Sequence, residues 1–135
     1  MQAPNVVRPI QQWRDPRHRR GLAGEIAAAR YLESAGWRIE AHRFRLGHHD
    51  IDLVARRGQV VAFVEVKART SATFGTGAQS VGWRKRAILR VVAALWIARH
   101  GTVGEEYRFD LVEVLDARGF QHVSHIPDAW RDVEK

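Results

Sequence analysis

The sequence predicts an α/β domain whose elements follow the order α-β-β-β-α-β. Two segments carry apolar residues at helical spacing, and the segments between them are rich in Val, Ile and Phe. Only a tight turn at Arg57-Gly58-Gln59 separates the second strand from the third. Because tight turns join antiparallel strands and helical crossovers join parallel ones, we expect a mixed sheet of four to five strands flanked by helices.

The two helices are predicted over residues 21–36 and 80–100. In the first, apolar residues recur at helical spacing and a glycine follows as terminator: Leu22, Ile26, Ala29, Leu32 and Gly36. In the second, the predicted apolar stripe is Val81, Ile88, Val91, Val92 and Leu95. Glu25 lies on or beside the first stripe, so this carboxylate needs a partner or a role.

The strands are predicted over residues 37–45, 50–56, 60–68 and 107–115, with a short edge strand over 120–126. Residues 60–68 are almost continuously apolar, which is typical of a central strand buried on both faces.

The chain of 135 residues suits one domain, predicted over residues 21–135. Residues 1–20 read as a basic, flexible tail that holds three of the four prolines. Its Arg17-His18-Arg19-Arg20 cluster could contact phosphate or form a solvated arm.

The formal net charge is +7, from 22 Lys and Arg against 15 Asp and Glu. Such a surplus attracts polyanions, so nucleic acid is the leading candidate partner. The absence of cysteine excludes disulfides, thiolate zinc sites and cysteine nucleophiles. Without a signal-like segment or a long apolar run, we expect a cytoplasmic protein that has no membrane partner.

Charged residues interrupt the apolar third strand on one face. Glu65 and Lys67 share that face because strand side chains alternate. A two-residue turn at Arg57-Gly58 would pair Asp52 with Phe63, which places Asp52 on the same face and diagonal to Glu65, about 7–8 Å away or less. A three-residue turn without a bulge would move Asp52 to the other face.

These residue types suit phosphodiester hydrolysis. Two close carboxylates repel each other at neutral pH, and a hard divalent cation such as Mg²⁺ or Mn²⁺ removes that penalty. The metal would activate a water, and Lys67 could orient that water and offset charge on phosphorus. The alternative is an ordinary ion pair between Glu65 and Lys67.

Other residues have both functional and structural interpretations. Arg69 and Lys85 could contact phosphate, or could be capping or snorkelling cations. His48 and His49 are better explained as loop histidines near the site than as zinc ligands, and His49 could contact phosphate. Trp83 could stack on a base, but core packing is the stronger expectation. Arg108 and Asp110 share a strand face and could pair with each other.

Several short motifs follow one another along the chain: Gly24-Glu25, Asp50-Ile51-Asp52-Leu53-Val54, Phe63-Val64-Glu65-Val66-Lys67-Ala68-Arg69, Phe74-Gly75, Lys85 and Arg108-Phe109-Asp110. In this order they resemble the motifs of the YraN family of small bacterial proteins. That family resembles Holliday-junction resolvases and the wider restriction-endonuclease-like superfamily. The resemblance covers residues 21–114. Where the family usually has Gly-Glu-Ile-Asp, this chain has His49-Asp50-Ile51-Asp52.

The resemblance implies a restriction-endonuclease-like core in which Asp52 and Glu65 bind the metal, Lys67 serves catalysis, and Glu25 approaches the same site. We therefore expect a metal-dependent DNA endonuclease that acts on branched or damaged DNA. The alternatives are a nucleic-acid-binding protein that keeps the nuclease fold without catalysis, and a scaffold or dimerisation protein. A homodimer is expected by analogy with junction resolvases.

Overall fold

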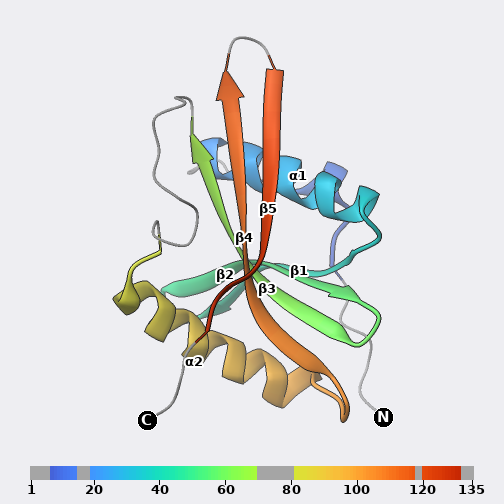
Figure 1. The fold of residues 1–135 in the computed structure, drawn as a ribbon, viewed down its shortest axis with the longest axis vertical. Coiled ribbons are helices and arrows are strands. Elements are labelled where there is room, and N and C mark those ends of the chain that lie inside the picture. The colour runs from blue at the N-terminus through green and yellow to red at the C-terminus, as the bar shows by residue number, and fades with distance from the viewer. Residues whose placement is uncertain (1–6, 15–18, 70–80, 118–119, 132–135) are drawn as a thin grey trace.

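A computed structural model describes residues 7–14, 19–69, 81–117 and 120–131 (Figure 1). The predicted order α-β-β-β-α-β is confirmed, with a fifth strand after it. The elements are η1 Ile10–Gln12, α1 Arg19–Ser34, β1 Arg38–Leu46, β2 His49–Arg57, β3 Val60–Arg69, α2 Trp83–His100, β4 Glu106–Ala117 and β5 Phe120–Trp130. The architecture is consistent with a restriction-endonuclease-like core.

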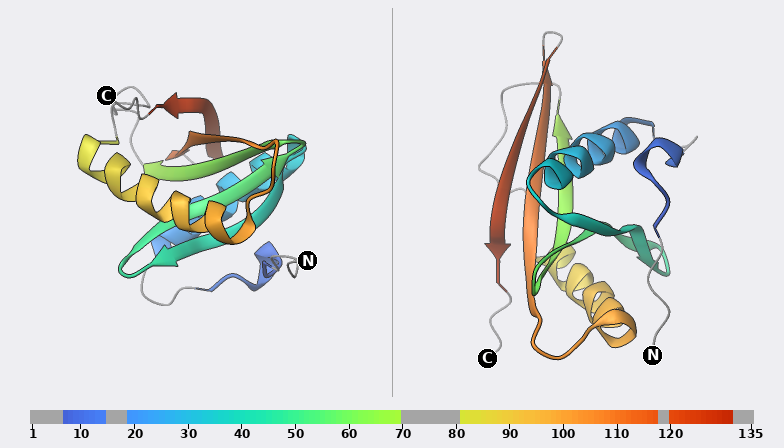
Figure 2. Two further views of the ribbon diagram at one scale, coloured as in Figure 1. Left: turned by 90° about the horizontal axis from the view of Figure 1, so that it is seen from below. Right: turned by 90° about the vertical axis from the view of Figure 1, so that its right-hand side faces the viewer.

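The five strands form one mixed sheet in the order β1-β2-β3-β4-β5. Only β3 and β4 pair in parallel, because α2 crosses over between them, whereas the other pairs are antiparallel. The predicted central position of β3 is confirmed. The two helices cover opposite faces of the sheet (Figure 2), and each packs against its own cluster of buried side chains.

The buried stripe of α2 differs from the predicted one. Its members recur at i, i+3, i+4 and i+7: Leu89, Val92, Ala93 and Trp96. Val91, which we predicted to be part of the stripe, is 58% exposed. The observed stripe is the predicted pattern displaced by one residue, from Ile88 and Leu95 to Leu89 and Trp96. Both sets are apolar at helical spacing, so the periodicity alone does not distinguish them.

Residues 7–14, within the predicted N-terminal tail, pack on the domain. Ile10 and Trp13 are buried in the cluster beneath α1. The Trp13 ring stacks on the imidazole of His42 at a centroid distance of 3.7 Å, and its Nε1 donates to the Arg8 carbonyl at 2.8 Å. No pattern in the sequence predicts these contacts.

The hairpin between β2 and β3 has a different register from the predicted one. The turn residues are Gly58 and Gln59, since Arg57 pairs with Val60 and Val54 with Phe63. Gly58 has a φ of +63°. Both favoured two-residue hairpin turns need a positive φ at their first position, so the glycine rather than Arg57 occupies it. Because the register moves by two residues, the side chains of the paired residues, from Leu53 to Arg57 and from Val60 to Val64, keep their predicted faces.

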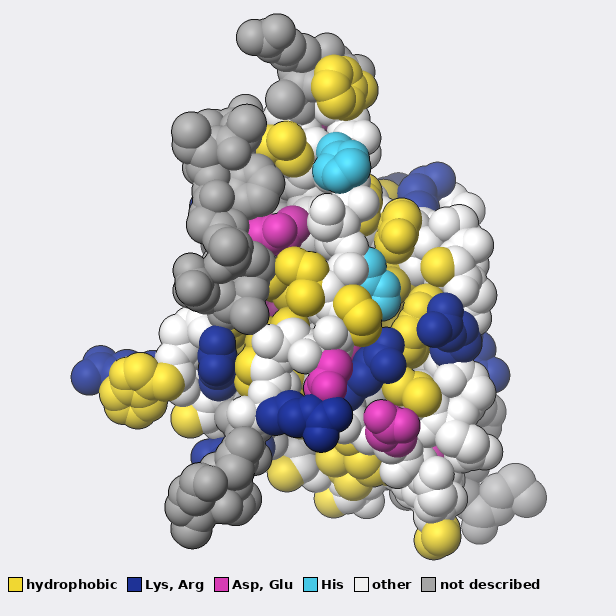
Figure 3. Space-filling model, viewed as in Figure 1, with side chains coloured by type: hydrophobic (Ala, Val, Ile, Leu, Met, Phe, Trp, Pro, Cys, Tyr) yellow, Lys and Arg dark blue, Asp and Glu magenta, His cyan; other side chains and the backbone are white. Residues whose placement is uncertain are grey.

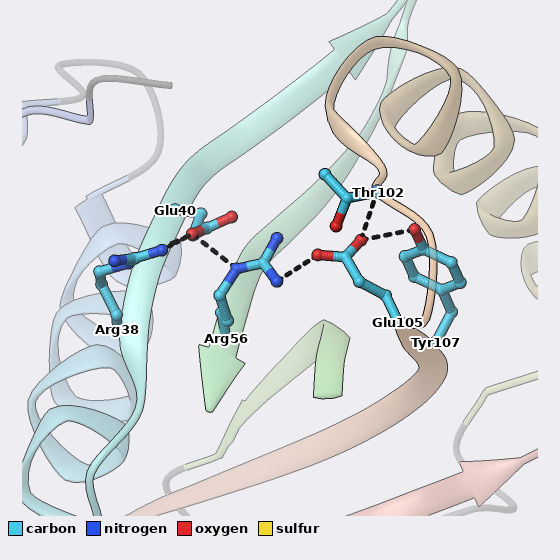
Figure 4. A network of polar contacts seen from close by, with 6 residues as sticks. All are labelled: Arg38, Glu40, Arg56, Thr102, Glu105 and Tyr107. Atoms are coloured by element: carbon cyan, nitrogen blue, oxygen red, sulfur yellow. Dashed lines mark hydrogen bonds and ion pairs between the residues drawn. The ribbon is translucent and has the colours of Figure 1, made fainter. Parts of the chain in front are cut away.

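A polar network lies at the turn end of this hairpin (Figure 4). Arg56 pairs with Glu105 and donates through Nε to Glu40 at 2.9 Å. The buried Glu105 carboxylate also accepts from the Tyr107 hydroxyl at 2.6 Å and from the Thr102 amide at 2.9 Å. Burial alone would raise the pKa of Glu105, but these donors outweigh it and lower the pKa to about 2.

Replacing Glu105 with glutamine is expected to lower the free energy of unfolding at pH 7 by about 2 kcal/mol. A depressed folded-state pKa stabilises the protein above the unfolded value near 4.5, and that contribution is lost as pH falls toward about 2. In urea unfolding, the difference in free energy of unfolding between wild type and Glu105→Gln should therefore become smaller as pH falls from 4.5 to about 2. Equal losses for the exposed Glu106→Gln control would contradict this role.

Candidate active site

The candidate site begins where the pairing of β2 with β3 ends. The ladder between these strands stops at Leu53 and Val64, although both strands continue. Alternation of the strand faces breaks at Asp52, because Ile51 and Leu53 pack in opposite core clusters. The predicted common face of Asp52 and Glu65 therefore stays a prediction, although the charge of Glu65 acts on Asp52. The Asp52 Oδ2 atom accepts a hydrogen bond from the Val66 amide at 2.7 Å. A carboxylate thus takes the place of a backbone acceptor and is fixed against β3.

Glu65 is the most enclosed carboxylate of the pair, at 5% exposure. Its Oε2 atom lies 3.8 Å from Nζ of Lys67 and 3.5 Å from Nζ of Lys85. Both distances exceed that of a strong charge-assisted hydrogen bond. Its Oε1 atom is buried and has no hydrogen-bond partner among the described residues. Such an oxygen is costly to leave unsatisfied, so it is a candidate ligand position.

The electrostatics of Asp52 also favour a cation-binding site. Burial and the neighbouring charge of Glu65 raise the pKa of Asp52 well above its usual value, and Glu25 and Asp50 add smaller contributions. The hydrogen bond from the Val66 amide opposes this shift without cancelling it. Four carboxylates therefore act on one small region, and a bound cation would relieve their repulsion.

The donor set of the site is small. Among the described residues, no group of three or more His, Asp or Glu side chains is arranged to hold a metal ion. Asp52 and Glu65 are the candidate ligands, since Glu65 is the carboxylate whose charge acts most strongly on Asp52. Mg²⁺ is commonly held by one or two carboxylates, with waters and substrate phosphate completing its octahedron, so this pair fits such an ion.

Glu25 lies close enough to influence Asp52 but is bound to β1. It is buried, and its Oε1 atom contacts Nε2 of His42 at 2.6 Å and Nε of Arg43 at 2.8 Å. Arg43 has a φ of +57°, an uncommon conformation for a residue with a side chain. Sequence reasoning identified Glu25 as a carboxylate that needs a partner, but it missed both partners, because the β1 backbone conformation leaves no signal in the sequence.

Gly24 sets how closely α1 approaches β3 beside this carboxylate. A Cβ atom at this position would lie 2.8 Å from the Cβ atom of Ala68. Gly24→Ala is therefore expected to lower the free energy of unfolding by about 1–3 kcal/mol, because the helix must move away from the strand. Thermal or urea unfolding measures the loss.

Gly21 offers a matched control on the same helix. A Cβ atom there meets its nearest neighbours at 3.8 Å, which is ordinary van der Waals contact. Gly21→Ala should be neutral or stabilising by up to about 1 kcal/mol, since alanine favours helix. If both variants lose stability equally, close packing at Gly24 is not the cause.

The other predicted site residues lie around this centre. Lys85 lies in the first turn of α2, the helix that crosses over between β3 and β4, and contacts Glu65 from there. Arg69 is the last residue of β3 and lines a cavity of about 390 Å³ with Gly24 and Ala68. His49 begins β2 and is exposed. The predicted Phe74-Gly75 motif lies outside the described residues.

Trp83 contradicts the prediction of core packing. Its side chain is 74% exposed, and the Arg84 guanidinium carbon lies 5.4 Å from its ring centroid. The other four tryptophans are at most 5% exposed: Trp13, Trp37, Trp96 and Trp130. The reason for the error is that α2 begins at Trp83, so the ring precedes the stripe that packs on the sheet.

No helix in the described part of the chain is long and apolar enough to cross a bilayer.

Comparison with known proteins gives one consistent family. The model described as "Uncharacterised protein family UPF0102" matches residues 24–114. A UPF0102 protein of Moorella thermoacetica is 45% identical over 98 residues, which cover 73% of this chain and 82% of that protein. A UPF0102 protein of Nocardia farcinica is 43% identical over 103 residues, or 76% and 81% of the two chains. One of Agrobacterium fabrum is 43% identical over 105 residues, or 77% and 84%.

Proposed function

This chain belongs to the uncharacterised protein family UPF0102 (YraN), and we propose that it is a metal-dependent nuclease that hydrolyses phosphodiester bonds in DNA. One observation carries the proposal. The buried Glu65 carboxylate, whose charge acts on Asp52, has an oxygen without a hydrogen-bond partner among the described residues and has two lysines beside it. A site of this kind suits a divalent cation and a phosphate better than it suits a closed ion pair.

The residues present fit Mg²⁺ or Mn²⁺. Asp52 and Glu65 offer hard oxygen ligands. Burial and then the charge of Glu65 raise the pKa of Asp52, and a bound cation would favour its ionised form. When bound, the ion would polarise the phosphodiester and promote ionisation of a water.

The chain's own cations provide the remaining functions. Lys67 lies on the same strand face as Glu65 and can orient the attacking water or donate to a phosphate oxygen. Lys85 is 49% exposed at its side chain, so it can bind a phosphate next to the one that is cut. Both amines lie beyond 3.4 Å from Glu65, so turning toward phosphate costs little.

The partner is proposed to be DNA because the chain carries a net charge of +7 and because of its likeness to restriction-endonuclease-like enzymes. Branched and damaged DNA are the proposed preferred substrates. A panel of duplex, nicked, single-stranded and four-way-junction oligonucleotides, incubated with Mg²⁺, Mn²⁺ or EDTA, tests both points.

The expected result is metal-dependent cleavage that falls at least about 100-fold in Asp52→Asn and in Lys67→Ala. Asp116→Asn is the matched control, since Asp116 is an exposed carboxylate at the far end of β4. If Asp52→Asn cuts as well as wild type, the site assignment is wrong.

A second candidate function follows from the contacts of Glu65 with Lys67 and Lys85. A protein that retains this ion-pair cluster for structure would bind nucleic acid without cleaving it. That function predicts salt-dependent binding, no turnover with any metal, and an unchanged affinity in Lys67→Ala. Measuring cleavage and binding on the same oligonucleotides separates the two functions.

A further inference from the structure

The N-terminal end of α2 exposes a large aromatic ring beside the candidate site. Trp83 is 74% exposed, whereas every other tryptophan of the chain is buried. In Figure 3, a hydrophobic side chain and basic neighbours stand out from the left edge of the molecule over this end of the helix. Single exposed apolar side chains are common on protein surfaces, so it is the cations around this indole, rather than its exposure alone, that indicate a ligand.

The surroundings of the ring indicate the kind of ligand. The Arg84 guanidinium lies over one side of the indole, at 5.4 Å from its centroid. Lys85, two residues further along, reaches the Glu65 carboxylate at 3.5 Å. A planar aromatic group flanked by cations is the arrangement that stacks a nucleobase and holds its phosphates. An acidic or purely apolar partner would not use both the ring and the cations.

Geometry also indicates which base is bound. Helical residues two positions apart point in different directions, so Trp83 and Lys85 cannot contact the same nucleotide from the same side. Since Lys85 contacts Glu65 and Trp83 lies two residues before it, a flanking nucleotide is the one that suits the ring. The face of a base is available for such stacking only when the base is unpaired or frayed, because its neighbours cover it in an intact duplex.

We propose that Trp83 stacks on an unpaired base next to the cleaved phosphate, so that the protein acts on DNA with a single-stranded segment rather than on continuous duplex. This inference rests on the proposed nuclease function. It also gives α2 two tasks, since one turn of the helix supplies both Lys85 to the carboxylates and Trp83 to the flanking base.

Fluorescence anisotropy in EDTA measures binding apart from cleavage. The probes are a fluorescein-labelled 20-nucleotide oligo-dT and a labelled 20-base-pair duplex. Trp83→Ala is expected to weaken oligo-dT binding by about 10-fold and to leave duplex binding unchanged. The dependence of affinity on salt should not change, because no charge is removed. Phe120→Ala is the control, as Phe120 is 62% exposed at the start of β5 and should have no effect.

Tryptophan emission gives a second measurement that a purely structural role would not change. Unlabelled oligo-dT should quench the wild-type emission, and the quenching should be lost in Trp83→Phe, while that variant keeps most of its affinity because phenylalanine also stacks. The inference is overturned if Trp83→Ala and Phe120→Ala behave alike, or if Trp83→Ala weakens duplex and oligo-dT binding equally.

The outcomes separate this inference from the nuclease proposal. Trp83-dependent binding without cleavage in Mg²⁺ or Mn²⁺ would support the stacking role and refute the nuclease. Metal-dependent cleavage that is unchanged in Trp83→Ala on every substrate would refute the stacking role and support the nuclease. If wild type binds neither probe at low salt, both fail.

Discussion

Asp52→Asn is expected to make the protein more stable and to abolish its stabilisation by Mn²⁺. In the wild type, burial and the nearby charge of Glu65 disfavour the ionised Asp52 carboxylate, so its pKa is raised. Asparagine keeps an oxygen that can accept the Val66 amide and removes the charge. We therefore expect a higher free energy of unfolding for Asp52→Asn than for the wild type at pH 8 without metal.

The pH dependence gives this prediction its sign. A carboxyl group whose folded-state pKa is raised binds its proton more tightly in the folded chain than in the unfolded chain. Ionised Asp52 therefore lowers the free energy of unfolding at high pH, and this loss is relieved as pH falls from above the folded pKa toward the unfolded value near 3.8. The stability advantage of Asp52→Asn should be largest at high pH and should shrink on acidification, as urea unfolding at several pH values would show.

Added Mn²⁺ should raise the melting temperature of the wild type, because an ion bound only to the folded state stabilises it by mass action. The same titration should have no effect on Asp52→Asn and a full effect on Asp116→Asn. Equal melting-temperature shifts for wild type and Asp52→Asn would show that Asp52 is not a ligand. A loss of stability in Asp52→Asn without metal would show that its charge is already compensated.

Asp110→Ala is expected to be the most destabilising of the substitutions discussed, at about 3–5 kcal/mol. The carboxylate is fully buried, and it accepts hydrogen bonds from Arg108 Nε at 3.0 Å and the Asp128 amide at 2.9 Å. The His125 ring contacts it at 2.7 Å. The predicted pairing of Arg108 with Asp110 is thus confirmed, and the carboxylate also fixes β5 where its register with β4 shifts.

Acid should reduce the effect of this substitution. Burial alone would raise the pKa of Asp110, but the hydrogen bonds from His125, Arg108 and the Asp128 amide outweigh it and lower the pKa. Its stabilising contribution is present above the unfolded value of 3.8 and is lost as pH falls through the lower folded value. In chemical denaturation, the difference in free energy of unfolding between wild type and Asp110→Ala should be large at pH 7 and smaller at pH 3. An equal loss in Asp116→Ala would contradict the role of the buried network.

Parity explains why the faces of the paired residues were predictable although the hairpin register was not. Placing the turn at Arg57 rather than at Gly58 displaced the pairing by two residues, and a shift of two leaves the side chains of the paired residues on their predicted faces. Asp52 and Glu65 lie beyond the last pair of this ladder, so their common face stays a prediction. The central position of β3 was predictable for a similar reason, since continuous apolar residues require burial on both faces.

Contacts between distant segments were not predictable in the same way. The stacking of Trp13 on His42 joins two segments that carry no matching pattern in the sequence. The predicted edge strand ended at residue 126, whereas β5 continues to Trp130. Pro127 is unusual inside a strand, and the irregularity that accommodates it, with a positive φ at Asp128 and a register shift, is not visible in the sequence. The exposure of Trp83 depends on where α2 begins, and helix ends are the least certain part of a sequence-based prediction.

The sequential strand order has a consequence for how the site assembles during folding. Asp52 and Glu65 belong to one hairpin, so their contact needs only a short loop to close, whereas Lys85 reaches them from the long crossover between β3 and β4. We expect the two carboxylates and Lys67 to come together with the local hairpin, and Lys85 to arrive only when α2 docks. Substitutions that weaken the docking of α2 should therefore remove the charge of Lys85 from the site first and leave Lys67 as the cation beside Glu65.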